Sequence, residues 1–241
     1  MLITYSDLIG ESVLLFVTFF GAVVFALLTG VCFHEFSHAF VADRLGDRTA
    51  RMAGRVSLNP VRHLDPAGTF FMMIAGFGWG KPVPVNPNRL RNGPEAGRAM
   101  VAAAGPLSNL LMAIIASIPM HLGLVDWRNP FRIPFTVSGW EFNDYAALFL
   151  SSVIVFNVFL AVFYLLPLAP LDGFSVAVGV LPRDLGRELS KLEQYGPGIL
   201  LLLFFLPFLT GGSLSPLYSI MSPITNALID LISGVKDAAA R

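Results

Sequence analysis

The chain has 241 residues, of which 55% are hydrophobic and only 13% charged, and its formal net charge at pH 7 is zero. A soluble domain carries about 25% charged residues, so this composition predicts a membrane protein with several spans. The neutral balance and the absence of a basic run argue against nucleic-acid binding, and the single cysteine, Cys32, excludes an internal disulfide framework or a cysteine-rich zinc site.

The first apolar stretch, residues 12 to 33, is long enough to cross a bilayer core, which takes about 20 residues. No basic segment precedes it, which indicates a retained span rather than a cleaved signal peptide. Acidic residues precede this span and arginines follow it. By the positive-inside rule, we expect the N-terminus outside and the other end of the span on the cytoplasmic side.

The segment His34-Glu35-Phe36-Ser37-His38 closes this stretch. On a helix, positions i and i+4 lie on one face, so His34 and His38 can direct their imidazoles at one point. Two histidines at this spacing hold Zn²⁺ in hydrolases, and the glutamate between them takes a proton from metal-bound water. Such polar groups are costly at the end of a membrane-length helix, so a functional role is favoured over a chance match.

The next segments are expected to be irregular. Residues 43 to 66 are polar and contain glycine and proline, which predicts a loop. The apolar stretch 67 to 80 is too short to span comfortably and has basic flanks, so we expect a re-entrant or membrane-edge β-hairpin there. Residues 81 to 88 alternate prolines with extended formers, which indicates a non-helical edge strand or loop.

A second span is predicted at about residues 99 to 122. Gly105 and Ser108 permit close helix approach, and Pro106 frees a backbone carbonyl that neighbours must satisfy. Asn109 is a polar side chain at membrane depth. An interhelical hydrogen-bond clip and a side chain that lines a site are equally good interpretations of it.

A third span, about residues 145 to 166, follows a loop that is more acidic than basic and is therefore expected outside. This span returns to the cytoplasmic side, where Pro167 and Pro170 break the helix and leave Asp172 on an unwound segment near membrane depth. Irregular backbone is tolerated there only when protein or a polar cavity surrounds it.

The C-terminal third contains a short apolar piece at 174 to 181, a charged loop at 183 to 193, and apolar runs at 197 to 209 and 214 to 232, whose topology stays open. We therefore predict an all-α polytopic membrane protein with four to six transmembrane helices and a re-entrant or β-hairpin element after the first span. It forms one domain over residues 1–241, with a catalytic core at about 12–182 and C-terminal spans at about 195–233.

Charge bias brings the ends of the first and third spans to one membrane face, and each carries candidate ligands. A catalytic zinc takes three protein ligands, often two histidines and a carboxylate, and leaves one position open for water. His34, His38 and Asp172 satisfy that count for one Zn²⁺ per chain. Glu35 is left as the general base. Asp172 could instead serve as a helix cap after Pro170.

Several segments together resemble the site-2 protease family of intramembrane zinc metalloproteases, in the family's order, from the first span to about residue 182. The resemblance implies zinc held by His34, His38 and Asp172, Glu35 as the base, and hydrolysis of transmembrane substrates in or near the bilayer, typically in regulated intramembrane proteolysis. No PDZ or CBS segment is recognised, so the chain resembles a minimal core. The resembling segments are residues 34–38, 54–69, 80–87, 105–109 and 167–173.

One position departs from the family pattern. Many members carry an asparagine eight residues before the ligand aspartate, where it helps to stabilise the oxyanion or bind substrate, whereas this chain has Tyr164. The nearest asparagine, Asn157, lies two helical turns earlier, about 10 Å away at 1.5 Å per residue. Candidates for this substrate or oxyanion role are therefore Asn109, Asn157 and the Tyr164 hydroxyl.

Two other functions remain as alternatives. A catalytically silent family member would bind transmembrane helices without cutting them, but it would not need Glu35. A zinc transporter or sensor would distribute ligands along a path through several spans, whereas here His121 stands alone on the opposite side. The expected partners are the lipid bilayer and a transmembrane protein substrate, with a regulatory membrane partner or a homo-oligomer left open. The expected location is a prokaryotic plasma membrane, with the active site toward the cytoplasm.

Overall fold

The computed structural model describes residues 12–75, 79–132 and 139–238, and these residues are mainly helical. The longest helices are α2, α5 and α6, and the shorter ones connect them or follow them. The elements are α2 (Val13–Arg44), α3 (Thr49–Met52), η1 (Pro60–Arg62), α4 (Pro66–Ala75), η2 (Pro87–Arg89), α5 (Pro94–His121), α6 (Phe142–Tyr164), α7 (Asp172–Val180), α8 (Arg183–Ser190), η3 (Glu193–Tyr195), α9 (Gly196–Leu209) and α10 (Pro216–Ser233).

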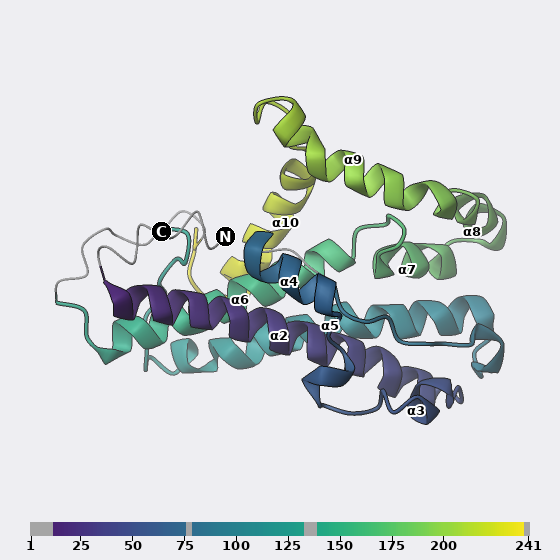
Figure 1. Ribbon diagram of the computed structural model, residues 1–241, viewed down its shortest axis with the longest axis horizontal. Helices are drawn as coiled ribbons and strands as arrows, with labels where there is room; N and C mark the ends of the chain where they lie inside the picture. Colours follow the sequence, from purple (N-terminus) through teal and green to yellow (C-terminus); the bar gives the residue numbers. More distant parts are fainter. Residues whose placement is uncertain (1–11, 76–78, 133–138, 239–241) are drawn as a thin grey trace.

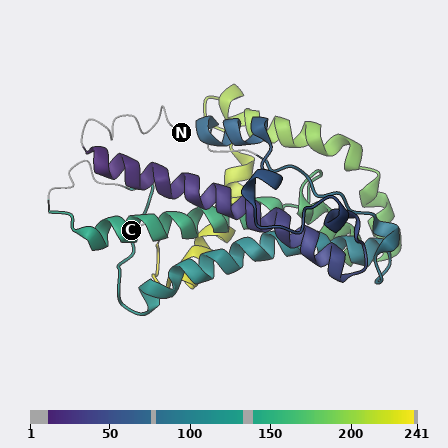
Figure 2. The same ribbon diagram turned by 60° about the horizontal axis from the view of Figure 1, so that its bottom comes forward.

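The helices α2, α5 and α6 lie side by side and form the central bundle (Figures 1 and 2). Buried apolar side chains of α2, among them Leu15, Phe19 and Val23, pack against Leu148 and Phe156 of α6. In a membrane such contacts stabilise the bundle mainly through van der Waals packing, because lipid tails are as apolar as leucine. The bundle therefore supplies a rigid frame for any side chain that points inward.

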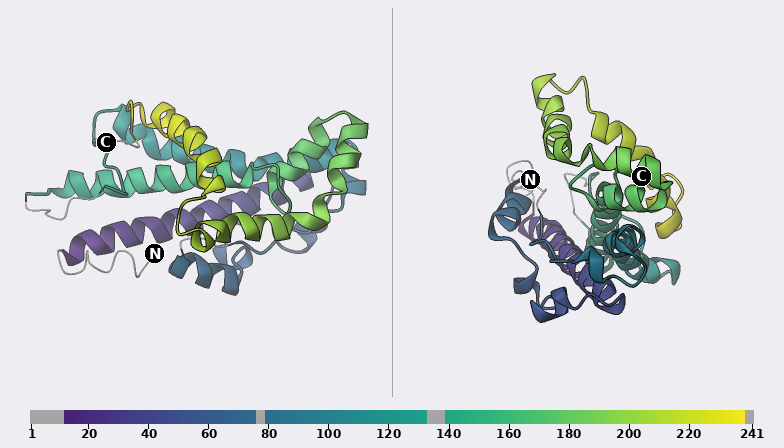
Figure 3. Two further views of the ribbon diagram at one scale, coloured as in Figure 1. Left: turned by 90° about the horizontal axis from the view of Figure 1, so that it is seen from above. Right: turned by 90° about the vertical axis from the view of Figure 1, so that its right-hand side faces the viewer.

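Four helical segments in the described part of the chain are long and apolar enough to cross a membrane: α2, α5, α6 and residues 183–209, which comprise α8, η3 and α9. This agrees with the predicted all-α polytopic fold. Only 6% of the apolar window in residues 183–209 is buried inside the protein. Figures 1 and 3 show α9 standing apart from the central bundle, so its apolar side chains face outward.

The element after the first span is a helix, and the prediction of a β-hairpin is wrong. Residues Pro66–Ala75 form α4, and the described residues contain only one isolated bridge, between Leu64 and Gly80. Asp65 accepts a hydrogen bond from the Gly68 backbone N–H at 2.8 Å, and Pro66 supplies a helical φ at the first position. Residues 76–78, which the hairpin prediction included, lie outside the described part.

A second correction concerns the segment 183–193, which sequence reasoning assigned to a charged loop. Most of it is helical, in α8 and η3. Its charges alternate with Leu185 and Leu189, a spacing that suits an amphipathic helix at a membrane surface. The helix α10 then packs against α6 and α5, with Met221, Ile229 and Ile232 in their shared core.

Residues 79–86, which we call the strap, are extended and run close to α2. At one end of the strap, the Lys81 N–H donates to the His63 carbonyl at 2.6 Å. At the other end, the Asn86 N–H donates to the buried Asp47 carboxylate, also at 2.6 Å. Burial alone would raise the pKa of Asp47, but hydrogen bonds from Thr49 and Asn86 outweigh it and lower that pKa. The ionised Asp47 carboxylate thus anchors this end of the strap.

Candidate metal centre

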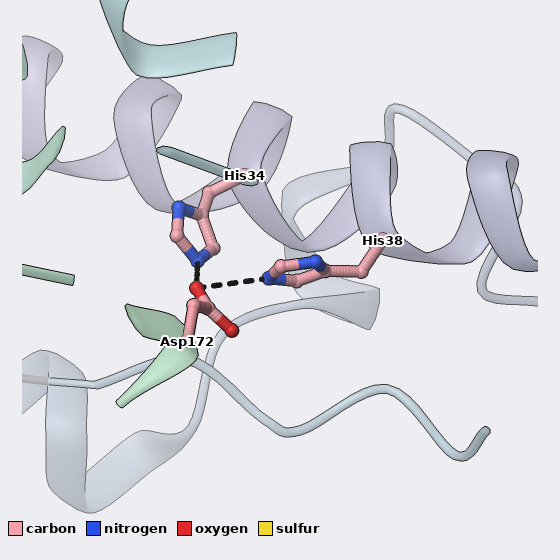
Figure 4. Close-up of side chains that lie close together, drawn as sticks. All are labelled: His34, His38 and Asp172. Carbon is pink, nitrogen blue, oxygen red and sulfur yellow. Dashed lines mark ion pairs between the residues drawn. The ribbon is translucent and has the colours of Figure 1, made fainter. Parts of the chain in front are cut away.

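The helix α2 continues without a break through the segment 34–38, so His34 and His38 occupy one face of it. Their rings lie edge to face with centroids 4.6 Å apart, and both side chains are buried. The Nε2 atoms of His34 and His38 lie 2.9 Å and 3.3 Å from Oδ2 of Asp172 (Figure 4). The sequence expectation that these three residues meet is consistent with this geometry.

Asp172 reaches the histidines because the chain breaks after the third long helix. The helix α6 ends at Tyr164, residues 165–171 are not helical, and α7 begins at Asp172 itself. A Cβ at Gly173 would lie 2.1 Å from the Leu165 carbonyl oxygen, so only glycine permits this tight return. Asp172 is therefore the first residue of α7 and a member of the site, whereas the capping position belongs to Leu171 and no side chain caps this helix, so the alternative of a helix cap does not describe Asp172.

The outer nitrogens of the two histidines are held by hydrogen-bond acceptors on α5. The His34 Nδ1 lies 2.8 Å from the Asn109 Oδ1, and the His38 Nδ1 lies 2.7 Å from the Val101 carbonyl oxygen. The Asn109 amide must present its oxygen to His34, because its nitrogen donates to the Gly30 carbonyl at 3.1 Å. Each Nδ1 consequently carries the proton, and each Nε2 presents a lone pair to Asp172.

This arrangement fits a metal ion and is unfavourable without a cation. One ligand atom from each of His34, His38 and Asp172 lies within 4.8 Å of the other two, and the Asp172 Oδ2 is buried with no hydrogen-bond donor. Lone pairs that converge in a buried place repel one another unless a positive charge joins them. Two imidazole nitrogens and one carboxylate oxygen form a donor set that zinc uses in catalytic sites.

Gly105 provides the space for the two imidazoles. A Cβ at this position would lie 2.6 Å from the His34 Nε2 and 2.6 Å from the His38 Cε1, closer than any real contact. The sequence predicts a close helix approach at Gly105, and the structure shows that the approach is to the ligand rings themselves. The Ser108 hydroxyl donates to the Gly105 carbonyl at 2.7 Å, which occupies one backbone acceptor of this turn.

The side chain of Glu35 extends from α2 toward the strap. This residue is 8% exposed and does not belong to the group that could hold the metal. A Cβ at Gly80 would lie 3.0 Å from the Glu35 Oε1, so the strap passes directly over this side chain.

Sequence reasoning missed Arg55, which it used only as a charge for topology. The buried guanidinium of Arg55 donates to the Lys81 carbonyl and, at 3.0 Å, to the Pro82 carbonyl of the strap. Its Nη2 is 3.9 Å from the Glu35 Oε2. Burial lowers the pKa of Arg55 while the nearby carboxylate raises it. No local pattern in residues 43–66 distinguishes this arginine from its exposed neighbours, because its partners come from residues 81–82.

The two candidate asparagines form one hydrogen-bonded network inside the bundle. The Asn109 Nδ2 donates to the Asn157 Oδ1 at 3.1 Å, and the Asn157 Nδ2 donates to the Val153 carbonyl at 2.9 Å. Both side chains are fully buried. Asn109 therefore acts both as an interhelical clip and as a partner of His34. Both amides are engaged within the protein.

Tyr164 lies against the metal group, at the position where the family pattern has asparagine. Its ring centroid is 4.2 Å from that of His34, with an interplanar angle of 39°. Two other histidines lie elsewhere: the His63 Nε2 is 2.5 Å from the Ser57 carbonyl oxygen, and the His121 Nε2 is 2.9 Å from the Ile232 carbonyl oxygen. Neither belongs to a metal-binding group in the described residues.

Replacing Asn109 with leucine is expected to weaken zinc binding about 10–100-fold, because outer partners of ligating histidines contribute that much to metal affinity. Asn109→Asp retains an acceptor for His34 and should lose less. Competition with a chromophoric chelator measures the affinity. Ser117→Ala is the control, since Ser117 is buried on the same helix but donates only to the Ile114 carbonyl. Equal affinities in the Asn109→Leu variant and the wild type would contradict the assigned role of Asn109.

The sequence is similar to several bacterial proteins whose names assign them to the zinc metalloproteases. YwhC of Bacillus subtilis is 36% identical over 184 residues, which cover 76% of this chain and 80% of YwhC. Rip2 of Mycobacterium tuberculosis is 31% identical over 209 residues, covering 85% of this chain and 75% of Rip2. Rip2 of Mycolicibacterium smegmatis is 29% identical over 197 residues, covering 80% and 70%. No protein-family model and no solved structure matches the sequence.

Proposed function

This chain belongs to the site-2 protease family of zinc metalloproteases, and from this premise we propose that it hydrolyses peptide bonds within the transmembrane segments of membrane-protein substrates. The observation that carries the proposal is that two of the three candidate ligands lie on a membrane-length helix. His34 and His38 lie on α2, a candidate membrane span of 32 residues, inside the bundle formed with α5 and α6. A protease with its ligands there acts on segments that enter the bilayer, as in regulated intramembrane proteolysis.

We propose that His34, His38 and Asp172 hold the zinc ion and that Glu35 is the general base. Zinc, when bound, lowers the pKa of water toward about 7 and polarises a carbonyl group. Glu35 accepts the proton that water loses and passes it to the nitrogen of the departing amine, so the base is restored after each turnover. The Arg55 guanidinium, whose Nη2 lies 3.9 Å from the Glu35 Oε2, places a positive charge beside the base.

We propose Tyr164 as a hydrogen-bond donor to the oxyanion. The amides of Asn109 and Asn157 are engaged with each other and with backbone carbonyls. The ring of Tyr164 packs on His34, so its hydroxyl belongs to the immediate surroundings of the metal group. A phenolic O–H is a donor of the kind that stabilises developing negative charge.

Access for water and substrate requires a polar path at membrane depth, and two segments that do not span the membrane are candidates to shape it: α4 with its flanks, and residues 165–171. The helix α4 has 10 residues, about 15 Å in length, which is too short to cross a core of about 30 Å. Because Gly80 forms a bridge with Leu64, just before α4, we propose that α4 enters the membrane from one face without crossing it. Together with residues 165–171, it would shape a polar cleft beside Glu35.

The proposed orientation places the N-terminus outside and the metal group toward the cytoplasm of a bacterial plasma membrane. The segment between α2 and α5 is rich in arginine, whereas residues 123–144 contain Asp126, Glu141 and Asp144 against two arginines. Cytoplasmic loops of membrane proteins carry the excess of Lys and Arg. Cysteine accessibility in intact cells, with single cysteines placed at Arg48 and Asp126, would test this orientation.

The full-length protein, purified in detergent, is expected to cleave at least one member of a panel of single-span substrates. Chelation should abolish cleavage and stoichiometric zinc should restore it, because the metal is required for the chemistry. Mass spectrometry of the products locates the cut relative to the transmembrane segment. A cut confined to soluble flanks would contradict the intramembrane assignment. Zinc-loaded protein that binds substrates but cuts none would instead support the silent-binder alternative.

A further inference from the structure

A cavity of about 180 Å³ lies outside the metal centre, between the start of α5 and the helices α7 and α8. Phe174 and Ser175 of α7 form part of its wall, close in sequence to Asp172. The cavity combines both signs of charge within a small volume. Its charged lining residues are Glu95, Arg98, Arg183, Arg187 and Glu193.

The charges in this cavity are not all paired with one another. Arg98 and Glu193 form an ion pair at 3.1 Å across it. Arg183 and Arg187, separated by one helical turn on α8, form no ion pair with the described residues, and neither does Glu95. Two guanidinium groups on one side and one carboxylate on the other are therefore available to a ligand.

The cavity lies beside the ends of candidate membrane spans, where lipid headgroups would be found. Two candidate spans begin beside it, one at Pro94 and the other at Arg183. On the amphipathic helix α8, Leu185 is 57% exposed, and the neighbouring α9 exposes a run of leucine and phenylalanine side chains. Lipid tails can therefore cover the apolar surface next to the cavity while a headgroup enters it.

The structure of the wall favours a headgroup over a polypeptide. Most lining residues belong to α5, α7 and α8, so the wall offers side chains and the first N–H groups of helices rather than a row of free backbone donors and acceptors. No strand edge lines the cavity in the part of the chain that the structure describes, so an extended peptide would find no backbone partners there. Side chains with fixed charges are the main polar contacts that this wall offers.

We propose that this cavity binds the headgroup of phosphatidylethanolamine, with the phosphodiester on Arg183 and Arg187 and the ammonium group on Glu95. Guanidinium groups match phosphate oxygens in charge and hydrogen-bond geometry. The carboxylate of Glu95 favours a zwitterionic headgroup over a purely anionic one, because an anionic headgroup would leave this negative charge without a partner.

The test uses the full-length protein in dodecyl maltoside with three probes: a short-chain phosphatidylethanolamine, the matching phosphatidylglycerol, and soluble glycerophosphoethanolamine. Native mass spectrometry and calorimetry measure binding. We expect one phosphatidylethanolamine per chain, bound more tightly than the other two probes. Arg183→Gln and Arg187→Gln should each weaken it about tenfold, as expected for loss of a charge-assisted contact. Arg48→Gln, which changes an exposed arginine near α3, is the control and should have no effect.

The variant Glu95→Gln tests the contact with the ammonium group separately from the contacts with the phosphodiester. It should reduce binding of phosphatidylethanolamine and improve binding of phosphatidylglycerol, since it removes the negative charge that distinguishes them. Unchanged melting temperature and zinc content in all variants show that the fold and metal group are intact. The proposal is overturned if the α8 variants bind phosphatidylethanolamine like the wild type or if Glu95→Gln leaves the lipid preference unchanged. It is also overturned if the soluble probe binds as tightly as the lipid.

Discussion

Replacing Glu35 with glutamine is expected to abolish peptide cleavage while leaving the zinc content of the protein unchanged. Glutamine has nearly the same shape as glutamate but cannot accept a proton at neutral pH. A positioned general base contributes about 10²–10⁴-fold to the rate, so cleavage should fall by at least that factor. Zinc content should persist, because Glu35 is not one of the three residues whose ligand atoms converge.

The measurement compares cleavage of one single-span substrate by the wild type and by Glu35→Gln, each at equal zinc content determined by elemental analysis. Glu188→Gln is the matched control, because Glu188 is exposed on α8 and pairs only with Lys191 in the described residues. This control should cleave at the wild-type rate. Substantial cleavage by the Glu35→Gln variant at full zinc occupancy would show that another group takes the proton.

Replacing Gly105 with alanine is expected to eliminate zinc binding and cleavage together. Helix propensity alone would predict that this substitution stabilises the protein, since alanine in a helix interior is favoured over glycine by about 0.5–1 kcal/mol. The added methyl group, however, would lie 2.6 Å from atoms of both His34 and His38. The imidazole rings cannot shift away from the methyl group without losing hydrogen bonds, because their Nδ1 atoms are hydrogen-bonded to groups on α5, the same helix as Gly105.

Gly21→Ala provides the matched control for this substitution. Gly21 lies within α2, and a Cβ there would meet no atom within 4 Å. We expect Gly21→Ala to leave zinc binding intact and the melting temperature unchanged or slightly higher. If the Gly105→Ala variant bound zinc with wild-type affinity, the close approach of α5 to the imidazoles would be wrong. A variant that is folded by circular dichroism but free of zinc would confirm that Gly105 acts on the site.

The element after the first span shows why sequence reasoning failed locally. The stretch 67–80 is apolar, short and rich in glycine, and these features suit a hairpin as well as a helix. The outcome depended on one cap: the Asp65 carboxylate accepts the Gly68 N–H, and Pro66 begins the helix. In addition, the prolines of the strap lack the N–H groups that a regular ladder with residues 60–66 would need.

The sequence by itself determined the class of the protein, the three long central spans and the identities of His34, Glu35, His38 and Asp172 as candidates. These features depend on composition, on hydrophobic length and on a spacing of four residues along one helix, all of which can be counted without a fold. The family resemblance rests on the same short segments, and the relatives named as zinc metalloproteases support it.

Only the tertiary structure decided how those candidates are held. The partner of the His34 Nδ1 is 75 residues away in sequence and that of the His38 Nδ1 is 63 residues away, so neither follows from local pattern. The clearance at Gly105 and the contact of Arg55 with the strap likewise depend on where separate segments cross. Such crossings are set by the packing of whole helices, and a one-dimensional pattern does not contain the relative positions of segments that meet only after folding.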